Sequence, residues 1–229
     1  MSARENILAR VRKACARDLS SAPNNEAMER AALLASLPSD VQRRINRPEP
    51  LTQPDVTEPL ADTLIDRMEA VQMSVARLQS SKDIVQAVEW FLQENDLPAL
   101  TCVAPALQHL PWASGTAFGP AEASHATGVS KAMTAIAETG SLVFQSGPES
   151  PATLNFLPEN HVVVLYESHI VARLEDVWNQ TREQDNIARA LNLVTGPSRT
   201  GDIEQTIELG AHGPRRVHVL LISADASID

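Results

Sequence analysis

The segment HVVVLYE, residues 161–167, decides the fold class because it is a short, nearly continuous apolar run. A strand that is buried on both faces has this pattern, whereas a strand with one face in water alternates between apolar and polar residues. Doubly buried strands occupy the centre of parallel sheets that helices cover on both sides. We therefore predict a central strand over residues 161–167.

The chain before this strand shows alternating helix and strand patterns. A helical spacing of apolar residues begins at Leu60, and residues 73–78 (MSVARL) then favour a strand. Residues 82–95 have a helical apolar face, with Ser80 or Ser81 available as the N-cap. The strand pattern of ALTCVAP, residues 99–105, completes a βαβ unit, which is typical of parallel sheets.

The chain after residue 167 continues in the same way. We predict a helix over 169–190, a strand at 190–196 (ALNLVTG), a helix over 202–210 (DIEQTIELG) and a last strand at 216–223 (RVHVLLIS). Together these patterns predict an α/β fold with a Rossmann-like, largely parallel sheet of six or seven strands, ending in a further βαβ unit.

Two internal segments are harder to interpret. Residues 132–146 (AMTAIAETGSLVFQS) fit either a helix that ends at Gly140 or two strands joined by a turn, and the missing polar helical face favours the hairpin. Residues 105–130 give no clear pattern. A long irregular segment in a compact domain is often a functional loop.

The first 59 residues form a separate region in this interpretation. Residues 2–17 and 26–36 have helical patterns, and five prolines then punctuate the chain between residues 38 and 59. We therefore predict a helical N-terminal extension with a proline-rich connector over residues 1–59, and the α/β domain over residues 60–229.

Composition excludes several classes of function. The net charge is −10 and no long basic patch offsets it, which argues against nucleic acid as a partner. The chain has no apolar run of about 20 residues that could span a bilayer and no secretory signal at its start, which predicts a cytoplasmic protein. The sequence is compatible with an oligomer.

Cofactor and metal motifs are absent from the sequence. Cys15 and Cys102 are too few for a four-thiolate iron–sulfur cluster, and buried structural thiols are the simpler interpretation. The chain contains no glycine-rich nucleotide signature and no HExxH or paired CxxC metal motif. We therefore predict no cofactor and no metal on this chain.

The best candidate for a binding site is the segment VTGPSRTGDIEQTIELGAHGP, residues 194–214. In the predicted fold, this segment is a loop between a strand and a helix, at the edge where α/β sheets bind ligands. Arg199 could bind a carboxylate or phosphate with its planar fork. The other candidate ligand-binding residues of the segment are Gly196, Ser198, Thr200 and Glu204. Ordinary helix capping explains the same residues equally well.

Three residues are candidates for acid–base catalysis: Glu138, Asp202 and His212. Asp202 and Glu204 would lie in the first turn of the predicted helix, where carboxylates complement the helix dipole and repel an incoming anion. His212 would then lie at the far end of that helix from Arg199. Thr139 and Gly140 become ligand-binding candidates if the hairpin places them beside Arg199.

Four motifs in this order, AIAETGSLV, LPENHVVVL, VTGPSRTGDIE and LGAHGP, resemble the LutC/YkgG-type lactate utilisation proteins, the LUD-domain family. The resemblance covers roughly residues 60–223, and this chain reads SPATLNFLP where the family often has an arginine. It implies a fold like that of the NagB/RpiA/CoA-transferase group. It also implies a part in oxidising L-lactate to pyruvate, with iron–sulfur clusters on partner subunits.

Three functions are therefore expected to compete. The first is a cytosolic subunit of a lactate-oxidising system that acts with iron–sulfur partner proteins and binds a small anionic ligand. The second is a stand-alone enzyme or binding protein for a sugar phosphate, CoA ester or folate, which rests on analogy of fold. The third is a non-catalytic assembly or regulatory subunit. Whether the chain itself is an enzyme is left open by its sequence.

Overall fold

The computed structural model describes residues 35–36, 39, 53, 55–182, 188–201, 207–210 and 212–223. The chain divides into two compact units, Met1–Pro54 and Asp55–Asp229, and the second unit contains both of the larger sheets. The predicted helix over residues 2–17, and all but the end of that over 26–36, lie outside the described residues. The predicted boundary after residue 59 stays a prediction.

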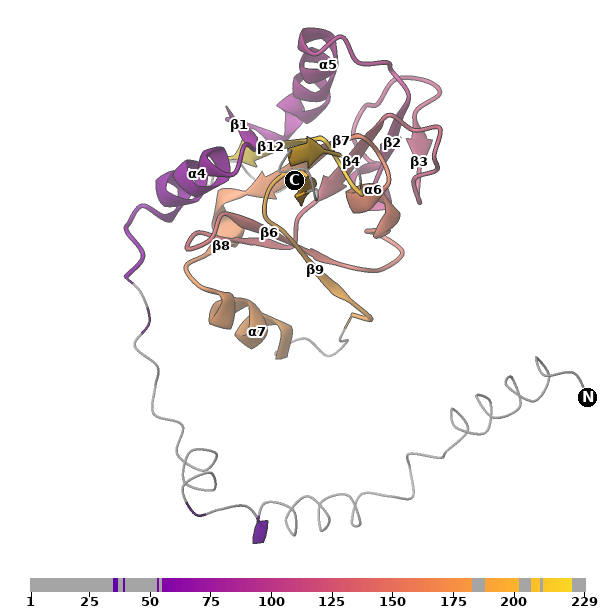
Figure 1. Ribbon diagram of the computed structural model, residues 1–229. Coiled ribbons are helices and arrows are strands. Elements are labelled where there is room, and N and C mark those ends of the chain that lie inside the picture. Colours follow the sequence, from indigo (N-terminus) through magenta and orange to yellow (C-terminus); the bar gives the residue numbers. More distant parts are fainter. Residues whose placement is uncertain are drawn as a thin grey trace, which may run out of the picture. The chain divides into compact units, whose positions relative to one another are not determined.

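A six-stranded sheet forms the centre of the fold, and all five of its strand pairings are parallel (Figure 1). Its strands, in spatial order, are β1 (Ser74–Leu78), β12 (Arg216–Ile222), β7 (Asn160–Tyr166), β4 (Thr127–Lys131), β2 (Thr101–Val103) and β3 (Ala117–Phe118). The predicted central strand is confirmed as β7, which lies between β12 and β4 and is buried along its whole length. The predicted α/β class with a largely parallel sheet is therefore confirmed.

A second sheet of four strands packs beside the first. Its order is β8 (Ile170–Val171), β5 (Thr134–Ile136), β6 (Ser141–Gln145) and β9 (Leu191–Val194). The predicted hairpin over residues 132–146 is confirmed, because β5 and β6 pair antiparallel and Gly140 turns the chain with a φ of +70°. The chain enters this sheet directly from the first one, since two residues separate β4 from β5 and one short 3₁₀ turn, Glu167–His169, separates β7 from β8.

Helices complete a layered arrangement. α5 (Ile84–Glu94) covers one face of the six-stranded sheet, where its Ile84, Val88 and Phe91 pack on residues of β7 and β12. α4 (Leu60–Ala70) and the second sheet cover the other face, and α7 (Leu174–Arg182) packs its Val177 on the outer side of the second sheet. Figure 1 shows α5 above the sheets and α7 below them. The remaining short helical elements are Ser81–Asp83, Pro105–Leu107 and α6 (Thr153–Phe156).

The start of α5 follows the sequence prediction closely. Ser80 accepts a hydrogen bond from the backbone N–H of Lys82 at 3.2 Å, so it caps the 3₁₀ turn that leads into the helix. At the other end, Asn95 donates from its side chain to the carbonyl of Phe91 at 2.9 Å. Both ends of the helix therefore have polar side chains that satisfy otherwise unpaired backbone groups.

The helix predicted over residues 202–210 is wrong in its described part, where Ile207–Leu209 form a strand. β10 (Arg199–Gly201) pairs antiparallel with β11 (Ile207–Leu209), and the residues between them lie outside the described part of the chain. β-Branched Thr200, Ile203, Thr206 and Ile207 lower helix propensity in this stretch. The helix predicted over 169–190 begins only at Leu174, because Ile170 and Val171 form β8. The chain also does not end in a simple βαβ unit, since β9 belongs to the second sheet.

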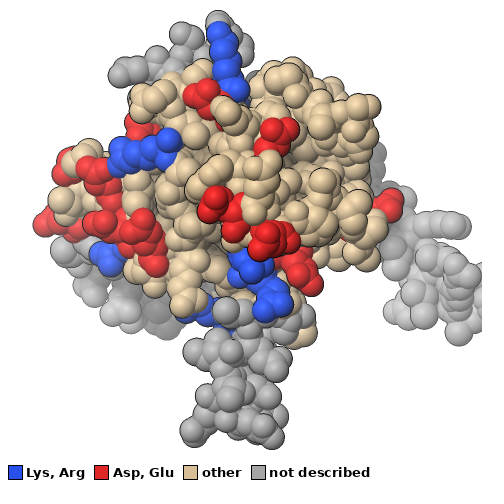
Figure 2. Space-filling model, turned by 90° about the horizontal axis from the view of Figure 1, so that it is seen from above, with Lys and Arg blue, Asp and Glu red and all other residues tan. Residues whose placement is uncertain are grey.

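Charged side chains are interspersed on the face of the molecule that carries α5. Figure 2 shows acidic and basic groups side by side there, without a broad basic area among the described residues. No helix in the described part of the chain is long and apolar enough to cross a membrane.

Candidate functional site

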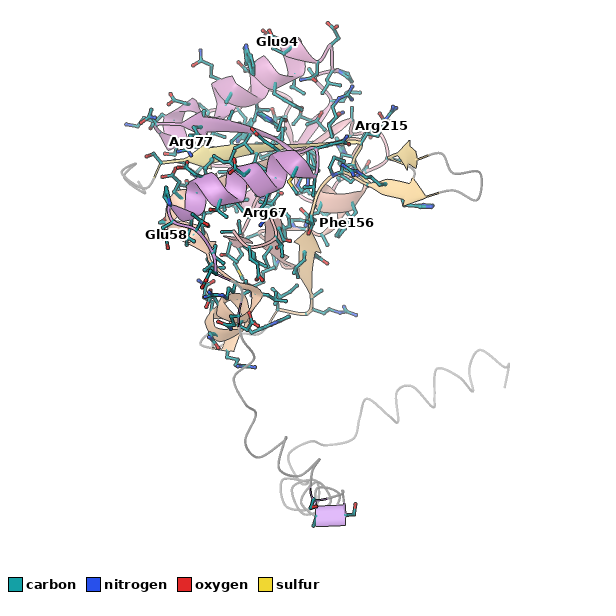
Figure 3. The ribbon with its side chains drawn as sticks, turned by 60° about the vertical axis from the view of Figure 1, so that its left-hand side comes forward. Glu58, Arg67, Arg77, Glu94, Phe156 and Arg215 are labelled. Atoms are coloured by element: carbon teal, nitrogen blue, oxygen red, sulfur yellow. The ribbon has the colours of Figure 1, made fainter. Side chains whose placement is uncertain are left out.

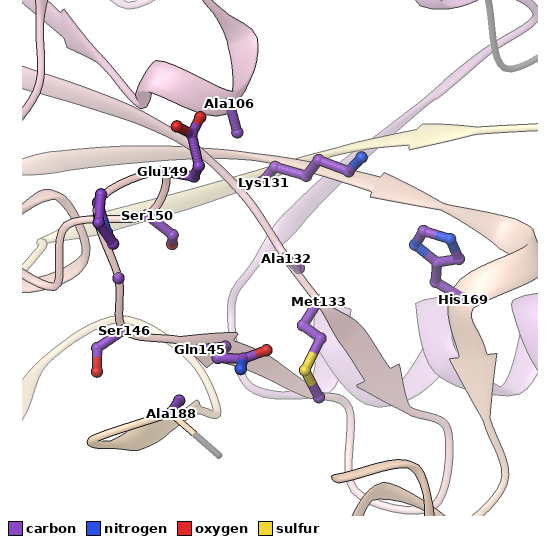
Figure 4. Close-up of a pocket in the computed structure, with 12 residues that line it drawn as sticks. Ala106, Lys131, Ala132, Met133, Gln145, Ser146, Glu149, Ser150, His169 and Ala188 are labelled. Carbon is purple, nitrogen blue, oxygen red and sulfur yellow. The ribbon is translucent and has the colours of Figure 1, made fainter. Parts of the chain in front are cut away.

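A pocket of about 460 Å³ lies at the carboxyl edge of the six-stranded sheet (Figure 4). Lys131 ends β4, while Ala106 and His169 each lie three residues after the ends of β2 and β7, so three of its lining residues lie at or just beyond the carboxyl ends of parallel strands. The second sheet supplies the opposite wall, at the end of β6 and in the loop that follows it. Ligands of open α/β sheets bind at this edge. This pocket is therefore the candidate functional site.

Lys131 and His169 form the polar end of the pocket. The amino group of Lys131 extends towards His169 in Figure 4 and lies 4.9 Å from the centre of the Tyr166 ring. Burial, and then the charge of Lys131, lowers the pKa of His169 below its ordinary value of 6.5. Its buried Nδ1 has no hydrogen-bond partner among the described residues. At neutral pH the site thus pairs one cation with one neutral imidazole.

The opposite wall contributes an amide, a carboxylate and two hydroxyls. These belong to Gln145, Glu149, Ser146 and Ser150. Ser146 accepts a hydrogen bond from the backbone N–H of Ala190 at 3.0 Å, and the backbone carbonyl of Glu149 accepts one from Ala106 at 3.2 Å. The wall is therefore fixed to the chain on both sides, to residues before β9 and to the turn after β2.

This set of groups suits a small organic anion that also carries a hydroxyl or carbonyl group. Lys131 supplies the charge for a carboxylate or phosphate. The neutral imidazole of His169 can accept or donate a proton at the adjacent oxygen of the ligand. No group of three or more His, Cys, Asp or Glu side chains that could hold a metal ion occurs in the described part of the chain.

The sequence-predicted site residues lie elsewhere, at the other end of the β5–β6 hairpin. The hydroxyl groups of Thr139 and Ser141 are hydrogen-bonded, with their oxygens 2.7 Å apart. The hydroxyl of Ser141 is also hydrogen-bonded to that of Thr195, directly after β9, at 2.6 Å. The ETG turn and the residue before the GPSRT loop are thus neighbours, while the ligand-binding roles of Thr139 and Gly140 stay predictions. We call residues 139–141 and 195–199 the motif cluster.

The motif cluster packs against the last turn of α4. A Cβ atom on Gly140 would lie 2.8 Å from the Cβ of Arg67 and 2.9 Å from the backbone N of Met68. A Cβ atom on Gly196, whose φ is +99°, would lie 2.9 Å from the carbonyl oxygen of Val71. Both glycines are therefore required by close approach to the helix as well as by their backbone conformation. Figure 3 shows Arg67 on this helix.

Arg199 also contacts α4. Its Nη2 donates to the carbonyl of Val71, the C-cap residue of the helix, at 3.0 Å. A cationic side chain is favourable at a helix C-terminus because it satisfies an orphan carbonyl and complements the helix dipole. In this structure Arg199 therefore acts as a helix cap.

We expect Arg199→Ala to lower the free energy of unfolding by about 1 kcal/mol, because an exposed charged hydrogen bond to a helix end is lost. Urea unfolding followed by circular dichroism would measure this difference. Arg182→Ala, in the exposed last turn of α7, is the matched control. An unchanged stability in Arg199→Ala would contradict the capping role.

The expectation that Arg199 and His212 lie at opposite ends of a helix is wrong. The backbone N–H of Ser198 donates to the carbonyl of Pro214 at 2.8 Å, and that of Gly210 donates to Ser198 at 2.9 Å. The β10–β11 hairpin thus returns the chain, and exposed His212 lies in the loop beside Ser198. His212 is nevertheless separate from the pocket at the carboxyl edge, which it does not line.

Of the remaining predicted site residues, the structure describes Glu138 and Thr200. Glu138 is half-buried, and its backbone N–H donates to the carbonyl of Ala172 at 3.1 Å. Thr200 lies in β10, paired with Glu208. Asp202 and Glu204 lie outside the described residues. Their roles as catalytic or ligand-binding residues stay predictions.

Sequence reasoning missed the residues that line the pocket, chiefly Lys131, His169, Gln145 and Glu149. His169 follows the predicted central strand by two residues, so its position at the carboxyl edge was a usable signal. Lys131 directly follows the segment 105–130, which gave no clear pattern, and ends the strand that begins inside it. Cys102 fits its structural interpretation, because burial raises the pKa of its thiol and its Sγ contacts the carbonyl of Gly119 at 3.5 Å.

Known proteins share both the fold and the sequence of this region. The LUD domain family matches residues 120–222. A crystal structure of a DUF162 family protein from Deinococcus radiodurans has a TM-score of 0.53 and 20% identity, and the match covers 74% of this chain and 99% of that one. At this identity the likeness shows the fold.

Curated relatives are similar over shorter segments. An uncharacterised protein of Neisseria meningitidis serogroup B is 35% identical over 99 residues, which cover 43% of this chain and 42% of the relative. The lactate utilization protein C of Anoxybacillus flavithermus is 32% identical over 88 residues, covering 38% and 40% of the two chains. That of an Exiguobacterium species is 31% identical over 99 residues, covering 42% and 43%.

These matches span about two fifths of the length of the curated relatives. The family match at residues 120–222 includes the β5–β6 hairpin and the central strand β7. Residues 120–222 therefore match the LUD domain family, and the chain is similar over part of its length to lactate utilization proteins C.

Proposed function

We propose that this chain is a subunit of an L-lactate utilisation system and binds lactate, or its product pyruvate, in the pocket at the carboxyl edge. One observation carries the proposal. The chain is similar to lactate utilization proteins C, and its carboxyl-edge pocket pairs the Lys131 cation with the neutral imidazole of His169. A 2-hydroxy acid presents a carboxylate and a hydroxyl on neighbouring carbons, which this pair would recognise together.

The residues of the pocket have separate roles in this proposal. Lys131 binds the carboxylate and orients the ligand. His169, neutral at physiological pH, accepts the hydroxyl proton as the C–O single bond becomes a carbonyl. Oxidation of lactate to pyruvate breaks the O–H and Cα–H bonds and releases two electrons and two protons in total, of which His169 takes the hydroxyl proton and water takes the proton from Cα. We propose iron–sulfur clusters on partner subunits as the acceptors of the electrons, in the cytoplasm.

Replacement of Lys131 by methionine is expected to weaken lactate or pyruvate binding by about tenfold or more, because a charge-assisted hydrogen bond is lost. Isothermal titration or ligand-observed NMR would measure the dissociation constants. Lys82→Met, in the exposed turn before α5, removes the same charge far from the pocket and serves as control. Equal binding by Lys131→Met and the unmodified protein would overturn the assigned site.

The proposed association with iron–sulfur partner proteins can be tested separately from ligand binding. The tagged chain, captured from lactate-grown cells, should bring an iron–sulfur protein with it. Capture of the chain without any such partner would count against the subunit role, whatever the result of the binding measurement.

A second candidate function follows from the size of the pocket. Its volume of about 460 Å³ lies in the range of about 300–1,000 Å³ that holds drug-sized ligands and exceeds what a three-carbon acid fills. A larger anion, such as a sugar phosphate, a CoA ester or a folate, would use the same lysine. Thermal stabilisation by one of these compounds, and none by lactate or pyruvate, would favour this second function.

A further inference from the structure

A second cavity lies at the opposite, amino edge of the six-stranded sheet. It has a volume of about 520 Å³ and is formed by the end of α5 and the starts of β1 and β12. Figure 3 labels Glu94, which ends α5, and Arg215, which precedes β12. Both residues line the cavity. Nothing in the proposed lactate chemistry uses this edge of the sheet.

A buried histidine forms the floor of this amino-edge cavity. His218 is 5% exposed, and its ring stacks on that of Phe91 with centres 4.6 Å apart and an angle of 11° between the planes. Its Nδ1 lies 2.8 Å from the hydroxyl oxygen of Ser74. Its Nε2 is buried and has no hydrogen-bond partner among the described residues.

The unpaired Nε2 of His218 indicates which ring nitrogen carries the proton, and therefore whether Ser74 donates or accepts in their hydrogen bond. A buried N–H without an acceptor is rarer in proteins than a buried acceptor without a donor. The favoured tautomer therefore carries its proton on Nδ1 and donates it to Ser74 Oγ. The hydroxyl proton of Ser74, which is exposed, is then available to a ligand in the cavity. Ser74 thus becomes an oriented hydrogen-bond donor, which suits an anion.

Catalysis by Ser74 and His218 is not supported by the same geometry. Burial lowers the pKa of His218 to about 4, so the imidazole is a weak base. A cationic ring would also lie against the face of Phe91 without a carboxylate on its second nitrogen among the described residues. The pair is suited to binding and not to activating a nucleophile.

The rim of the cavity adds charge and an aromatic surface. Arg215 and Arg216 are both exposed, and Arg216 is oriented by a hydrogen bond from its Nη1 to Asn160 at 3.2 Å. Trp90 exposes 56% of its surface, which is unusual for the largest apolar side chain. Glu94 would repel a ligand that is anionic throughout, but its carboxylate can accept from hydroxyl or amino groups.

We propose that the amino-edge cavity binds a nucleoside monophosphate or a closely similar planar ligand with a terminal phosphate. The phosphate lies between the two arginines and the Ser74 hydroxyl. The planar ring stacks on Trp90, and its amino or ribose hydroxyl groups donate to Glu94. Each part of the ligand thus meets a group that the cavity presents, and the volume lies within the usual range for such ligands.

Adenosine 5′-monophosphate is the probe for this site, with adenosine and inorganic phosphate as the partial ligands. Titration of the full chain, followed by calorimetry, should show binding of the monophosphate at millimolar concentration or below. Each partial ligand should bind at least about tenfold more weakly, because each lacks either the stacked ring or the charge. Equal binding of phosphate and the monophosphate would overturn the proposal, as would no binding of the monophosphate.

Two variants locate the ligand. Trp90→Ala should weaken monophosphate binding by about tenfold, since base–aromatic stacking is lost. Trp178→Ala removes a similarly exposed tryptophan from α7, on the far side of the second sheet, and should leave binding unchanged. Thermal unfolding of both variants establishes that they fold. Equal affinities of Trp90→Ala and Trp178→Ala would overturn the assigned position.

Discussion

Acidification from about pH 6.5 to about pH 4 is expected to destabilise this protein steeply, because two buried histidines stay neutral in the fold. Burial lowers the pKa of His161 to about 3 and that of His218 to about 4. His161 is fully buried on β7, between β4 and β12, where its Nε2 meets the Ser130 hydroxyl at 2.7 Å and its Nδ1 has no partner among the described residues.

The sign and the pH window follow from the two pKa values of each histidine. Its unfolded value is 6.5, so below that pH the unfolded chain binds a proton that the folded chain excludes. Stability is therefore full above pH 6.5 and is lost as the pH falls, until the folded pKa is reached. Each histidine contributes about 1.4 kcal/mol per pH unit within its window.

Urea unfolding at a series of pH values would measure the slope of stability against pH. The two histidines together predict about 2.7 kcal/mol per unit in the window, and His218→Asn should roughly halve the slope. The slope remains informative even if the variant is less stable at every pH. His109→Asn, at an exposed position, should leave the slope unchanged. An equal slope in His218→Asn and the unmodified protein would refute the linkage.

Gly140→Ala is expected to lower the free energy of unfolding by about 3 kcal/mol. A left-handed backbone conformation costs a non-glycine residue about 1–2 kcal/mol, and overpacking costs about 1–3 kcal/mol more. Both apply here, because Gly140 has a φ of +70° and its new methyl group would lie 2.9 Å from the backbone of Arg67 and Met68. Helix backbone cannot move aside as a flexible side chain can.

A comparison with Gly115 separates the cost of the left-handed backbone from the cost of overpacking. Gly115 has a φ of +93° but no atom within 4 Å of an added Cβ, so Gly115→Ala should cost only the conformational part, about 1 kcal/mol. Urea unfolding of both variants measures the difference. If the two variants lost the same stability, the contact between the ETG turn and α4 would have no energetic role.

The sequence predicted those elements whose pattern and environment agree. β7 is apolar throughout and buried on both faces, and α5 has one apolar face and a serine cap. In the hairpin, the run before Gly140 lacked a polar helical face, and the glycine itself marked the turn. In each case local preference and tertiary packing indicate the same structure.

Strands that are buried by contacts with segments distant in the sequence could not be predicted from local sequence. β4 reads TGVSK and looks polar, yet its first four residues are buried, and a Cβ atom on Gly128 would lie 2.7 Å from the backbone oxygen of Leu154. The strand pairing of 199–201 with 207–209 likewise depends on contacts between segments, while the short apolar spacing of DIEQTIEL also fits a helix. Short segments of this kind leave the periodicity ambiguous.

For the candidate site, the sequence marked the two motif loops but indicated neither that they are neighbours nor where the pocket lies. Glycines and Arg199 in the two loops were visible as turn and anion-binding chemistry, and the structure places both loops on α4. Lys131 is the last residue of β4 and His169 lies in the turn after β7, and they come together only because β4 and β7 are adjacent. Their proximity depends on strand order, which local sequence does not encode.

The junctions between the two sheets have a consequence for how this site can diversify. Lys131 is the last residue of the buried strand β4, and His169 ends the short turn after β7, so both lie where the chain passes from one sheet to the other. Neither side chain belongs to the fully buried core. If the proposed ligand site is correct, substitutions at these two positions should change which anion binds while the sheets, and with them the stability of the domain, stay as they are.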